Sequence, residues 1–289
     1  LTHAGLDTAE VERLVAAALA EDLGGGVDVT SVAAVPFDHE SIADFVSRAP
    51  GVIAGLPLVA VVLWTAAPDS AVDIDEHVVD GMRVDAGTAL LSASGRTRTL
   101  LTAERTALNL LGHLSGIATL TRAWVDAIAG SGAAIRDTRK TTPGLRALEK
   151  YAVRCGGGVN HRMSLSDAAL IKDNHVLAAG GVAPAFAAVR AAFPDVPVEV
   201  ECDTVEQVGE AVDAGADLVL LDNMSTQSMR AAVALVRERG SACRLEASGG
   251  LTLARAAEVA ATGVDYLSVG ALTHSAPVLD IGVDLRPAL

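Results

Sequence analysis

From about residue 134 the chain alternates between short apolar runs and alanine-rich segments, and this alternation limits the possible folds. The apolar runs, each of which ends in polar residues, occupy residues 133–138, 167–175, 197–204, 217–223, 243–250 and 264–270. Helix-like segments lie between them at residues 185–193, 204–215, 226–240 and 252–263. Alternating strands and helices form βαβ units with a parallel sheet and right-handed crossovers. We therefore expect an α/β fold with an open, incomplete barrel of the triosephosphate-isomerase type.

A doubly wound open sheet is the alternative to a barrel. The first strand-to-helix turn lacks the GxGxxG pattern, which counts against a dinucleotide-binding fold.

The first 110 residues follow a different pattern. Residues 1–24 have the spacing of an amphipathic helix, and residues 72–95 contain repeated Gly and Asp turns between alternating segments. This pattern is typical of a small, mainly antiparallel α+β domain. We expect an N-terminal domain at residues 1–110, with the C-terminal tail 276–289 as a candidate to pack on it, and a barrel domain at residues 111–275.

A long helix at residues 101–130 is expected to join the two domains. Along it, Arg105, Asn109, Gly112 and Gly116 follow helical spacing and form a thin stripe. The two glycines of this stripe allow another backbone, or a ligand, to approach closely.

Composition excludes several classes of function. The net charge of −14 argues against nucleic acid or an anionic membrane surface as a partner. The most apolar stretch, residues 52–67, is short for a membrane span and carries Pro57, so we expect a buried helix there. No secretory signal opens the chain. Cys155, Cys202 and Cys243 are widely spaced, which predicts free thiols and a cytoplasmic location.

Charged residues follow the ends of the expected strands, where a parallel barrel places its active site. One group is cationic and comprises Arg139, Lys140, Arg162 and Lys172, with His161 beside them. Arginine suits bidentate contact with carboxylate or phosphate, and lysine suits a point contact. The stretch RDTRK, which contains the first two of these cations, is therefore expected to form the cationic rim of an anion pocket.

A second group is acidic. Glu201 and Asp222 end two neighbouring strands, and two carboxylates suit a Mg²⁺ ion that a phosphate-bearing substrate shares. The glycine-containing loops 247–251 and 269–274 follow the last two strands and could donate backbone N–H groups to a phosphate. Each loop could equally be a tight turn. The residues predict a site for a substrate with carboxylates and phosphates.

Other functions remain open at this point. A Schiff-base lyase could use Lys172 at a strand end, although the arginine cluster and paired acids fit that chemistry less well. A related pyrophosphorylase could act on another acid. A non-enzymatic binding protein would have no use for the acidic group.

Several motifs resemble those of the quinolinate phosphoribosyltransferase family. They are RDTRKTTPGLRALEKYAV, GGGVNHRMSLSDAALIKDNH, VEVECDT, LLDNM, EASGGL and VDYLSVGALTHS. The resemblance covers nearly the whole chain. It implies an N-terminal α/β sandwich domain and an open α/β barrel. It also implies transfer of a phosphoribosyl group from 5-phosphoribosyl-1-pyrophosphate (PRPP) to quinolinate with Mg²⁺, releasing pyrophosphate and CO₂ and giving nicotinate mononucleotide for NAD biosynthesis.

The resemblance also implies a role for each site residue. Arg105 would enter the site of a partner subunit in a homodimer or a multiple of it. Four residues would hold the two quinolinate carboxylates: Arg139, His161, Arg162 and Lys172. Lys140, Glu201 and Asp222 would be catalytic on the phosphoribosyl side, with the two acids also at the metal. The remaining contacts to substrate would come from Thr138, Ser248, Gly249, Gly250, Val269, Gly270 and Ala271.

Overall fold

A computed structural model describes residues 1–68 and 70–288 of the chain. The chain divides into two compact units, which are described separately. Unit 1 comprises Leu1–Leu120, Ala147–Gly157 and Ser275–Leu289, and unit 2 comprises Thr121–Arg146 and Gly158–His274. Leu289, the last residue of the predicted C-terminal tail, lies outside the described residues.

This division differs from the predicted boundaries at residues 110 and 275 in two segments and at Ser275, which belongs to unit 1. Residues 111–120 belong to unit 1 because the helix that contains them continues through residue 110 and buries Leu111 and Leu114 in that unit's core. Residues 147–157 also belong to unit 1, although they lie between two strands of unit 2 in the sequence.

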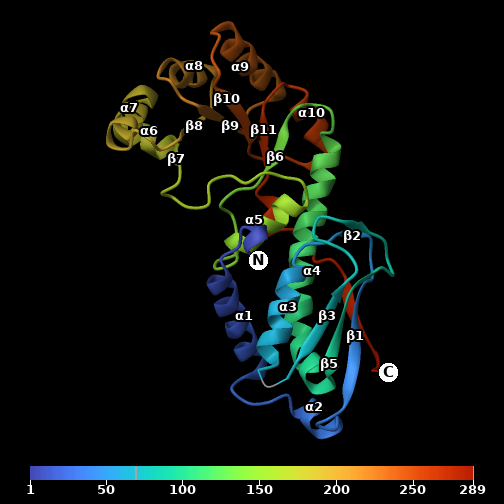
Figure 1. Cartoon of the computed structure of the whole chain (residues 1–289). Coiled ribbons are helices and arrows are strands. Elements are labelled where there is room, and N and C mark those ends of the chain that lie inside the picture. Colours follow the sequence, from blue (N-terminus) through green and yellow to red (C-terminus); the bar gives the residue numbers. More distant parts are fainter. Residues whose placement is uncertain (69, 289) are drawn as a thin grey trace. The chain divides into compact units, whose positions relative to one another are not determined.

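Unit 1 combines helices with an antiparallel sheet (Figure 1). Its elements are α1 (Thr8–Leu23), α2 (Val29–Ala34), β1 (Glu40–Ser47), β2 (Gly51–Val52), α3 (Leu56–Ala66), β3 (Val72–Glu76), β4 (Arg83–Val84), β5 (Ala89–Arg96), most of α4 (Thr97–Ala127), α5 (Arg146–Cys155) and β12 (Ile281–Pro287). The main sheet has the strand order β12-β1-β5-β3. The predicted antiparallel α+β character of the N-terminal region is confirmed.

The C-terminal strand β12 is part of this sheet. It pairs antiparallel with β1, from Ser41 opposite Pro287 to Ser47 opposite Ile281. Along β1 the side chains are alternately more and less buried, so one face of the strand packs into the core.

Helix α3 begins later than the predicted apolar stretch but is buried as expected. Leu58, Val59, Val62 and Leu63 have no exposed surface. Asp80 accepts hydrogen bonds from the N–H groups of the residues that start this helix, Gly55 and Leu56, at 2.8 and 3.1 Å. Within the described residues no single helix is long and apolar enough to cross a membrane, and one helix pair bent by 89° passes by length and composition only.

The small residues of α4 make room for the chain's own C-terminal segment. A side chain at Gly116 would overlap the carbonyl oxygen of Pro277, and the N–H of Leu279 donates to the carbonyl of Gly112 at 3.0 Å. Of the two predicted reasons for the stripe, a closely packed backbone is therefore correct and a ligand is not needed. This contact also removes one reason for linking Arg105 to a ligand.

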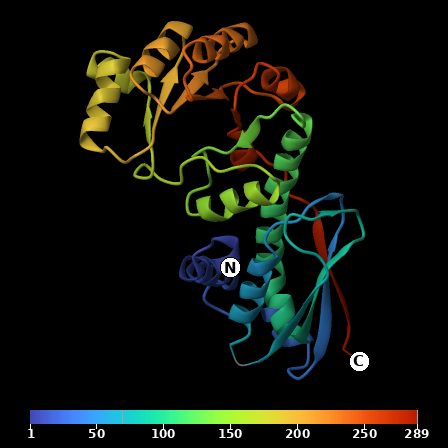
Figure 2. The ribbon, with the colours of Figure 1, turned by 45° about the horizontal axis from the view of Figure 1, so that its top comes forward.

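Unit 2 is an open α/β barrel. Its elements are β6 (Ala134–Arg136), β7 (Ala169–Ile171), α6 (Asp173–Ala179), α7 (Val182–Ala192), β8 (Val198–Cys202), α8 (Val205–Asp213), β9 (Leu218–Asp222), α9 (Thr226–Glu238), β10 (Arg244–Ser248), α10 (Ala256–Ala260), β11 (Tyr266–Ser268) and α11 (Ala271–His274). The six strands are parallel in the order β6-β11-β10-β9-β8-β7. The edge strands β6 and β7 do not pair with each other, so the barrel is open, as predicted. Figure 2 shows the helices of this unit around the strands.

Hydroxyl side chains cap two of the helices in unit 2. Thr204 caps α8 by accepting the N–H of Gln207 at 3.3 Å. Ser225 caps α9 by accepting the N–H of Ser228 at 3.1 Å. Each hydroxyl oxygen satisfies an N–H that has no partner within its helix.

All three cysteines are free thiols, as predicted. Burial raises the pKa of Cys202 to about 12 and that of Cys155 and Cys243 to about 11. A thiol with a raised pKa is a poor nucleophile, so these residues serve as small packing groups.

Candidate active site

The pleat of the parallel strands directs alternate residues of unit 2 into the barrel. Paired residues in the sheet show which positions share a layer: Glu201 aligns with Leu220, and Leu220 aligns with Glu246. Two residues further along, Asp222 aligns with Ser248. Side chains two positions apart on a strand lie on the same face. Each strand therefore carries one side chain inside the barrel and, two residues later, another side chain on the same face at its carboxyl end.

A cavity of about 630 Å³ lies at these strand ends, within unit 2. It brings together most of the predicted site residues: Thr138, Arg139, Lys140, His161, Arg162, Lys172, Glu201, Asp222, Ser248, Gly249 and Gly250. It is also lined by residues that were not predicted to contact substrate: Leu170, Leu220, Asn223, Glu246 and Ser268.

Two arginines crowd one part of the cavity. Burial lowers the pKa of the Arg162 guanidinium from its ordinary value, and the nearby charge of Arg139 lowers it further. The Nε atom of Arg139 is buried and has no hydrogen-bond partner among the described residues. A buried donor without a partner is costly, so this region favours an anion with acceptor oxygens.

Lys172 and Glu201 form an ion pair inside the cavity. The Nζ atom of Lys172 donates to Oε2 of Glu201 at 2.6 Å, and the two side chains are 49% and 12% exposed. The cationic and acidic groups therefore meet at this pair. An anion that binds Lys172 has to share the ammonium with Glu201 or displace it.

Arg136 is not part of the cationic rim, contrary to the prediction for RDTRK. Its Nη1 atom donates to Oε2 of buried Glu246 at 2.6 Å, and its guanidinium lies 4.6 Å from the ring centre of Tyr266. Arg136 is the last residue of β6, so its side chain follows the interior face of the sheet, whereas Arg139 lies beyond the strand end.

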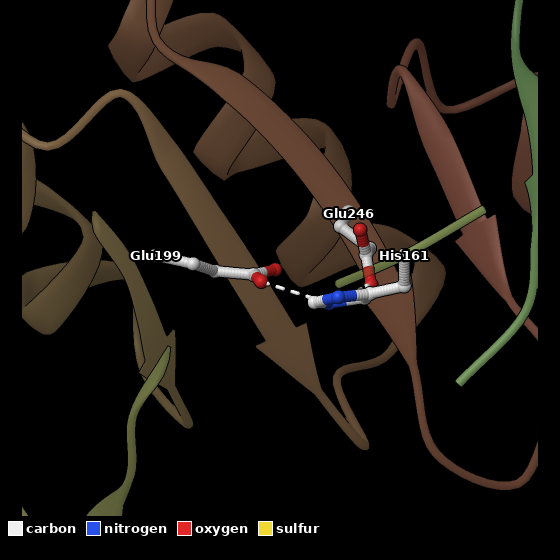
Figure 3. A group of neighbouring side chains, drawn as sticks. All are labelled: His161, Glu199 and Glu246. Atoms are coloured by element: carbon white, nitrogen blue, oxygen red, sulfur yellow. Dashed lines mark ion pairs between the residues drawn. The ribbon is translucent and has the colours of Figure 1, made fainter. Parts of the chain in front are cut away.

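His161 connects the two buried glutamates of the barrel interior (Figure 3). Its Nε2 atom lies 2.9 Å from Oε2 of Glu199 and 3.6 Å from Oε1 of Glu246. Burial raises the pKa of Glu199 to about 7, and burial with the nearby charge of Glu199 raises the pKa of Glu246. Ser268 also donates to Glu246.

His161, Glu199 and Glu246 have the composition of a metal site, but their hydrogen bonds favour another interpretation. The backbone N–H of Arg162 donates to Nδ1 of His161 at 2.7 Å, which assigns the proton of a neutral ring to Nε2. That N–H points toward Glu199, and Glu246 is already neutralised by Arg136. We therefore interpret the three residues as a hydrogen-bonded group that orients His161 and the start of Arg162.

A smaller cavity of about 190 Å³ adjoins the same strand ends. It contains the predicted residues Val269, Gly270 and Ala271, and it shares Thr138, Lys140 and Ser248–Gly250 with the larger cavity. The stem of Lys140 lies against Gly270, where an added side chain would come within 2.9 Å of Cδ. The glycine lets this lysine lie along the rim.

Arg105 is not among the residues that line the two cavities of unit 2. It lies in α4 in unit 1, where its side chain is exposed in the single chain. Its predicted role in a partner's site stays a prediction.

Two of the residues that were not predicted could have been found from the sequence. Glu199 and Glu246 each precede a predicted site residue, Glu201 or Ser248, by two positions on the same strand. Strand alternation therefore places them on the same face. Asn223 directly follows Asp222, but its contacts depend on the path of a neighbouring loop, which the sequence pattern does not give.

Comparison with known proteins identifies the family. The model of the domain described as "Quinolinate phosphoribosyl transferase, N-terminal domain" matches residues 28–115, and that of the corresponding C-terminal domain matches residues 117–284. A nicotinate-nucleotide pyrophosphorylase [carboxylating] of Mycobacterium leprae (strain TN) is 53% identical over 268 residues, covering 93% of this chain and 94% of the relative. A quinolinate phosphoribosyltransferase [decarboxylating] of Nicotiana tabacum, 2b, mitochondrial, is 39% identical over 99% of this chain and 84% of its own.

Solved structures agree with the sequence comparison. The crystal structure of NadC from Streptococcus pyogenes superposes with a TM-score of 0.93 at 39% identity, covering 98% of this chain and 99% of that one. The fold, the residues gathered at the strand ends and the family matches together show that this chain belongs to the quinolinate phosphoribosyltransferase family.

Proposed function

We propose that this protein transfers the phosphoribosyl group of PRPP to quinolinate with loss of CO₂, giving nicotinate mononucleotide and pyrophosphate. The names of the relatives describe this reaction. The observation that carries the proposal is a single cavity that brings together cations that suit carboxylates, two acids and a glycine-rich loop.

Quinolinate has two adjacent carboxylates, and the cationic side of the cavity offers more than one partner for them. Arg139 and Arg162 can each make bidentate contacts, and Lys172 can make a point contact. The buried Nε of Arg139 has no partner among the described residues, and burial with the nearby charge of Arg139 lowers the pKa of Arg162, so two like charges lie close together here. A dicarboxylate would supply negative charge beside both.

The acids and the glycine-containing loops of the cavity suit the phosphoribosyl donor. Glu201 and Asp222 both present carboxylate oxygens to the cavity, which are ligands that Mg²⁺ prefers. We propose that these two residues hold Mg²⁺ together with the pyrophosphate of PRPP, where the ion would balance the charge of the leaving group. Loop residues Ser248–Gly250 and Val269–Ala271 would receive the 5′-phosphate through backbone N–H groups.

The chemistry requires charge placement more than covalent catalysis. The bond between C1 of the ribose and the pyrophosphate oxygen breaks, and both electrons leave with pyrophosphate. Glu201 and Asp222 can stabilise the positive charge that develops at C1. The ring nitrogen of quinolinate donates its electron pair to C1, and Arg139 and Arg162 hold the acid in the position for this attack.

Loss of CO₂ follows from the new positive charge on the ring nitrogen. The bond to the carboxylate on the adjacent carbon breaks, and its electron pair stays on that carbon, where the cationic nitrogen stabilises it. This carbon then takes a proton from water in place of CO₂. Lys140 lies at the junction of the two cavities and is suited to balance phosphate charge.

The finer parts of the proposal concern assembly and place in the cell. We propose a homodimer, or a multiple of it, in which Arg105 of one subunit enters the cavity of the other. The exposure of Arg105 in the single chain supports this arrangement. Three free thiols support a reducing, cytoplasmic environment.

Product analysis tests the proposed function. The protein is incubated with quinolinate, PRPP and Mg²⁺, and nicotinate mononucleotide, pyrophosphate and CO₂ are measured. We expect the three products in equal amounts, and we expect chelation of Mg²⁺ to abolish them. A nucleotide that keeps both carboxylates, or the absence of any nucleotide with a folded protein, would contradict the proposal.

A further inference from the structure

Asn223 has an unusual backbone conformation at the edge of the cavity. It follows β9 directly and has a φ of 51°, and among residues 1–68 and 70–288 no other non-glycine residue has a positive φ. Asparagine tolerates this left-handed conformation better than most residues, but glycine tolerates it best. The choice of asparagine therefore indicates that the side chain has a use.

The side chain of Asn223 contacts the acid beside it. Its Nδ2 atom donates to Oδ2 of Asp222 at 2.9 Å. This hydrogen bond fixes one of the two carboxylate oxygens of Asp222. The carboxylate is therefore held in one orientation toward the cavity.

Asn223 also contacts the glycine-rich loop that follows the neighbouring strand. Its N–H donates to the carbonyl of Ser248 at 2.9 Å. A Cβ atom added at Gly249, which has a φ of 87°, would overlap the amide group of Asn223. The side chain of Asn223 therefore occupies the space that Gly249 leaves open.

We infer that Asn223 is a positioning residue that joins the two parts of the PRPP site: it orients Asp222 and holds the Ser248–Gly250 loop in its binding shape. This inference rests on the proposed function, because it assigns the metal-side acid and the phosphate loop to one ligand. Asn223 would thereby keep the residues that contact pyrophosphate at a constant distance from the residues that contact the 5′-phosphate.

Asn223→Gly distinguishes a role of the side-chain contacts from a role of the left-handed backbone conformation. Glycine adopts the left-handed conformation without strain, so a residue needed only for the turn would be replaced without loss. We expect the Kd for PRPP, measured by calorimetry with Mg²⁺, to rise about tenfold, because a hydrogen bond to a charged group is lost. We expect the KM for quinolinate to change less than about twofold.

Asn223→Asp provides an independent variant that keeps the size of the side chain. It replaces the amide donor by a carboxylate beside Asp222, so we expect PRPP binding to weaken by at least as much as in Asn223→Gly.

A double-mutant cycle tests the contact with Gly249. Gly249→Ala should weaken PRPP binding strongly in the wild-type background. It should do so much less in the Asn223→Gly background, where the overlapping amide is absent. Gly215→Ala is the matched control: Gly215 has a φ of 93°, precedes the other end of β9 and has no atom within 4 Å of an added Cβ. It should lower the melting temperature and leave the Kd for PRPP unchanged.

The outcomes separate the two proposals. Wild-type protein that binds no PRPP would overturn the proposed function. Wild-type binding with an unchanged Kd in folded Asn223→Gly, or an equal loss for PRPP and quinolinate, would overturn the role of Asn223 alone. Additive effects of Asn223→Gly and Gly249→Ala would also overturn it.

Discussion

Two carboxylates in the interior of unit 2 are nearly inaccessible to water. Glu199 is 4% exposed and Glu246 is 0% exposed. A buried carboxylate is costly unless it is paired or hydrogen-bonded. Arg136 pairs with Glu246, and His161 donates to Glu199, so both acids receive partners from outside their own strands. The same bonds hold the backbone that leads into Arg162.

The raised pKa of Glu199 predicts a change of stability with pH. Its pKa rises from 4.5 to about 7 on folding, so the folded state binds this proton more tightly than the unfolded state does. The resulting stability is complete below about pH 4.5 and is lost as pH rises through about 7. The loss is about 3 kcal/mol in the free energy of unfolding.

Glu199→Gln should remove this contribution. We expect the wild type to lose stability relative to this variant between pH 4.5 and 7 in denaturant titrations with a chelator present. Glu210→Gln, at an exposed position of α8, should keep the wild-type slope. A Glu199→Gln protein with the wild-type pH dependence would show that this carboxyl does not titrate in the expected range.

Arg139→Lys tests the assignment of the cationic side. Lysine keeps the charge but cannot form two parallel hydrogen bonds to one carboxylate. We expect the Kd for quinolinate to rise roughly 10- to 100-fold, and the Kd for PRPP to change less than about threefold. Arg255→Lys, at an exposed ion pair of the barrel unit, should change neither value. Equal weakening of both ligands would mean that Arg139 does not belong to the acid's side.

The polar residues at strand ends were predictable from the sequence because strand direction and alternation position them. Glu201 and Asp222 follow this rule and line the cavity. Arg136 does not, since its three-residue strand ends with that arginine facing the interior. A cation at a strand end can face either the cavity or a buried acid. The outcome depends on a partner on another strand, here Glu246, and the local sequence pattern does not reveal that partner.

The long helix α4 shows how an element is shaped by a distant segment. Gly116 and Gly112 lie where residues 277–279 cross the helix. The sequence predicted a close approach at these glycines, because only small residues allow it. It did not identify the approaching segment, since residues more than 150 positions away leave no local signal.

Gly116→Ala should reveal this crossing as a loss of stability. On helix propensity alone, alanine would stabilise the helix by about 1 kcal/mol. Here the new methyl group would overlap the carbonyl of Pro277, so we expect a net destabilisation of about 1–3 kcal/mol in denaturant unfolding. Asn109→Ala, at an exposed position of the same helix, should not destabilise the protein. Stabilisation by Gly116→Ala would mean that the crossing segment moves away freely.

The strands and four of the helices of unit 2 were predictable because each apolar run is bounded by polar turns and each of these helices keeps its apolar spacing. Helix α6 was not predicted, since it begins at Asp173, inside the apolar run 167–175. The six predicted strand segments all contain a strand, although the strands are shorter, for example Tyr266–Ser268 within residues 264–270. Terminal residues of the runs leave the sheet early and form loops of the site, except in the run 167–175, where they begin helix α6. Propensity cannot separate the last paired residue from the first loop residue.

If two subunits share each site, mixing two inactive variants should restore activity, which a single chain cannot do. Arg105→Ala and Lys172→Ala should each be nearly inactive alone. Mixed under conditions of subunit exchange, they form dimers in which one site carries both defects and the other carries neither. A statistical mixture contains about half heterodimer, so we expect about a quarter of wild-type activity.

Verification of exchange makes this experiment decisive. Subunits with different tags are mixed, and heterodimers are quantified before the assay. Absence of recovery with heterodimers present would show that Arg105 serves its own chain's site or none. Mixing Lys172→Ala with Arg139→Ala is the matched control, because both residues line the cavity of one chain and no intact site can form.

The cations of the cavity are proposed to recognise two carboxylates of the acceptor. The most direct measurement is kcat/KM with PRPP for quinolinate and for nicotinate, each as the sole acceptor. Nicotinate lacks one carboxylate and would leave a buried cation unpaired, at a cost of roughly 2–5 kcal/mol. We predict that quinolinate is preferred by roughly 30-fold to several thousandfold. Comparable kcat/KM values for the two acids would show that the cations do not recognise a second carboxylate.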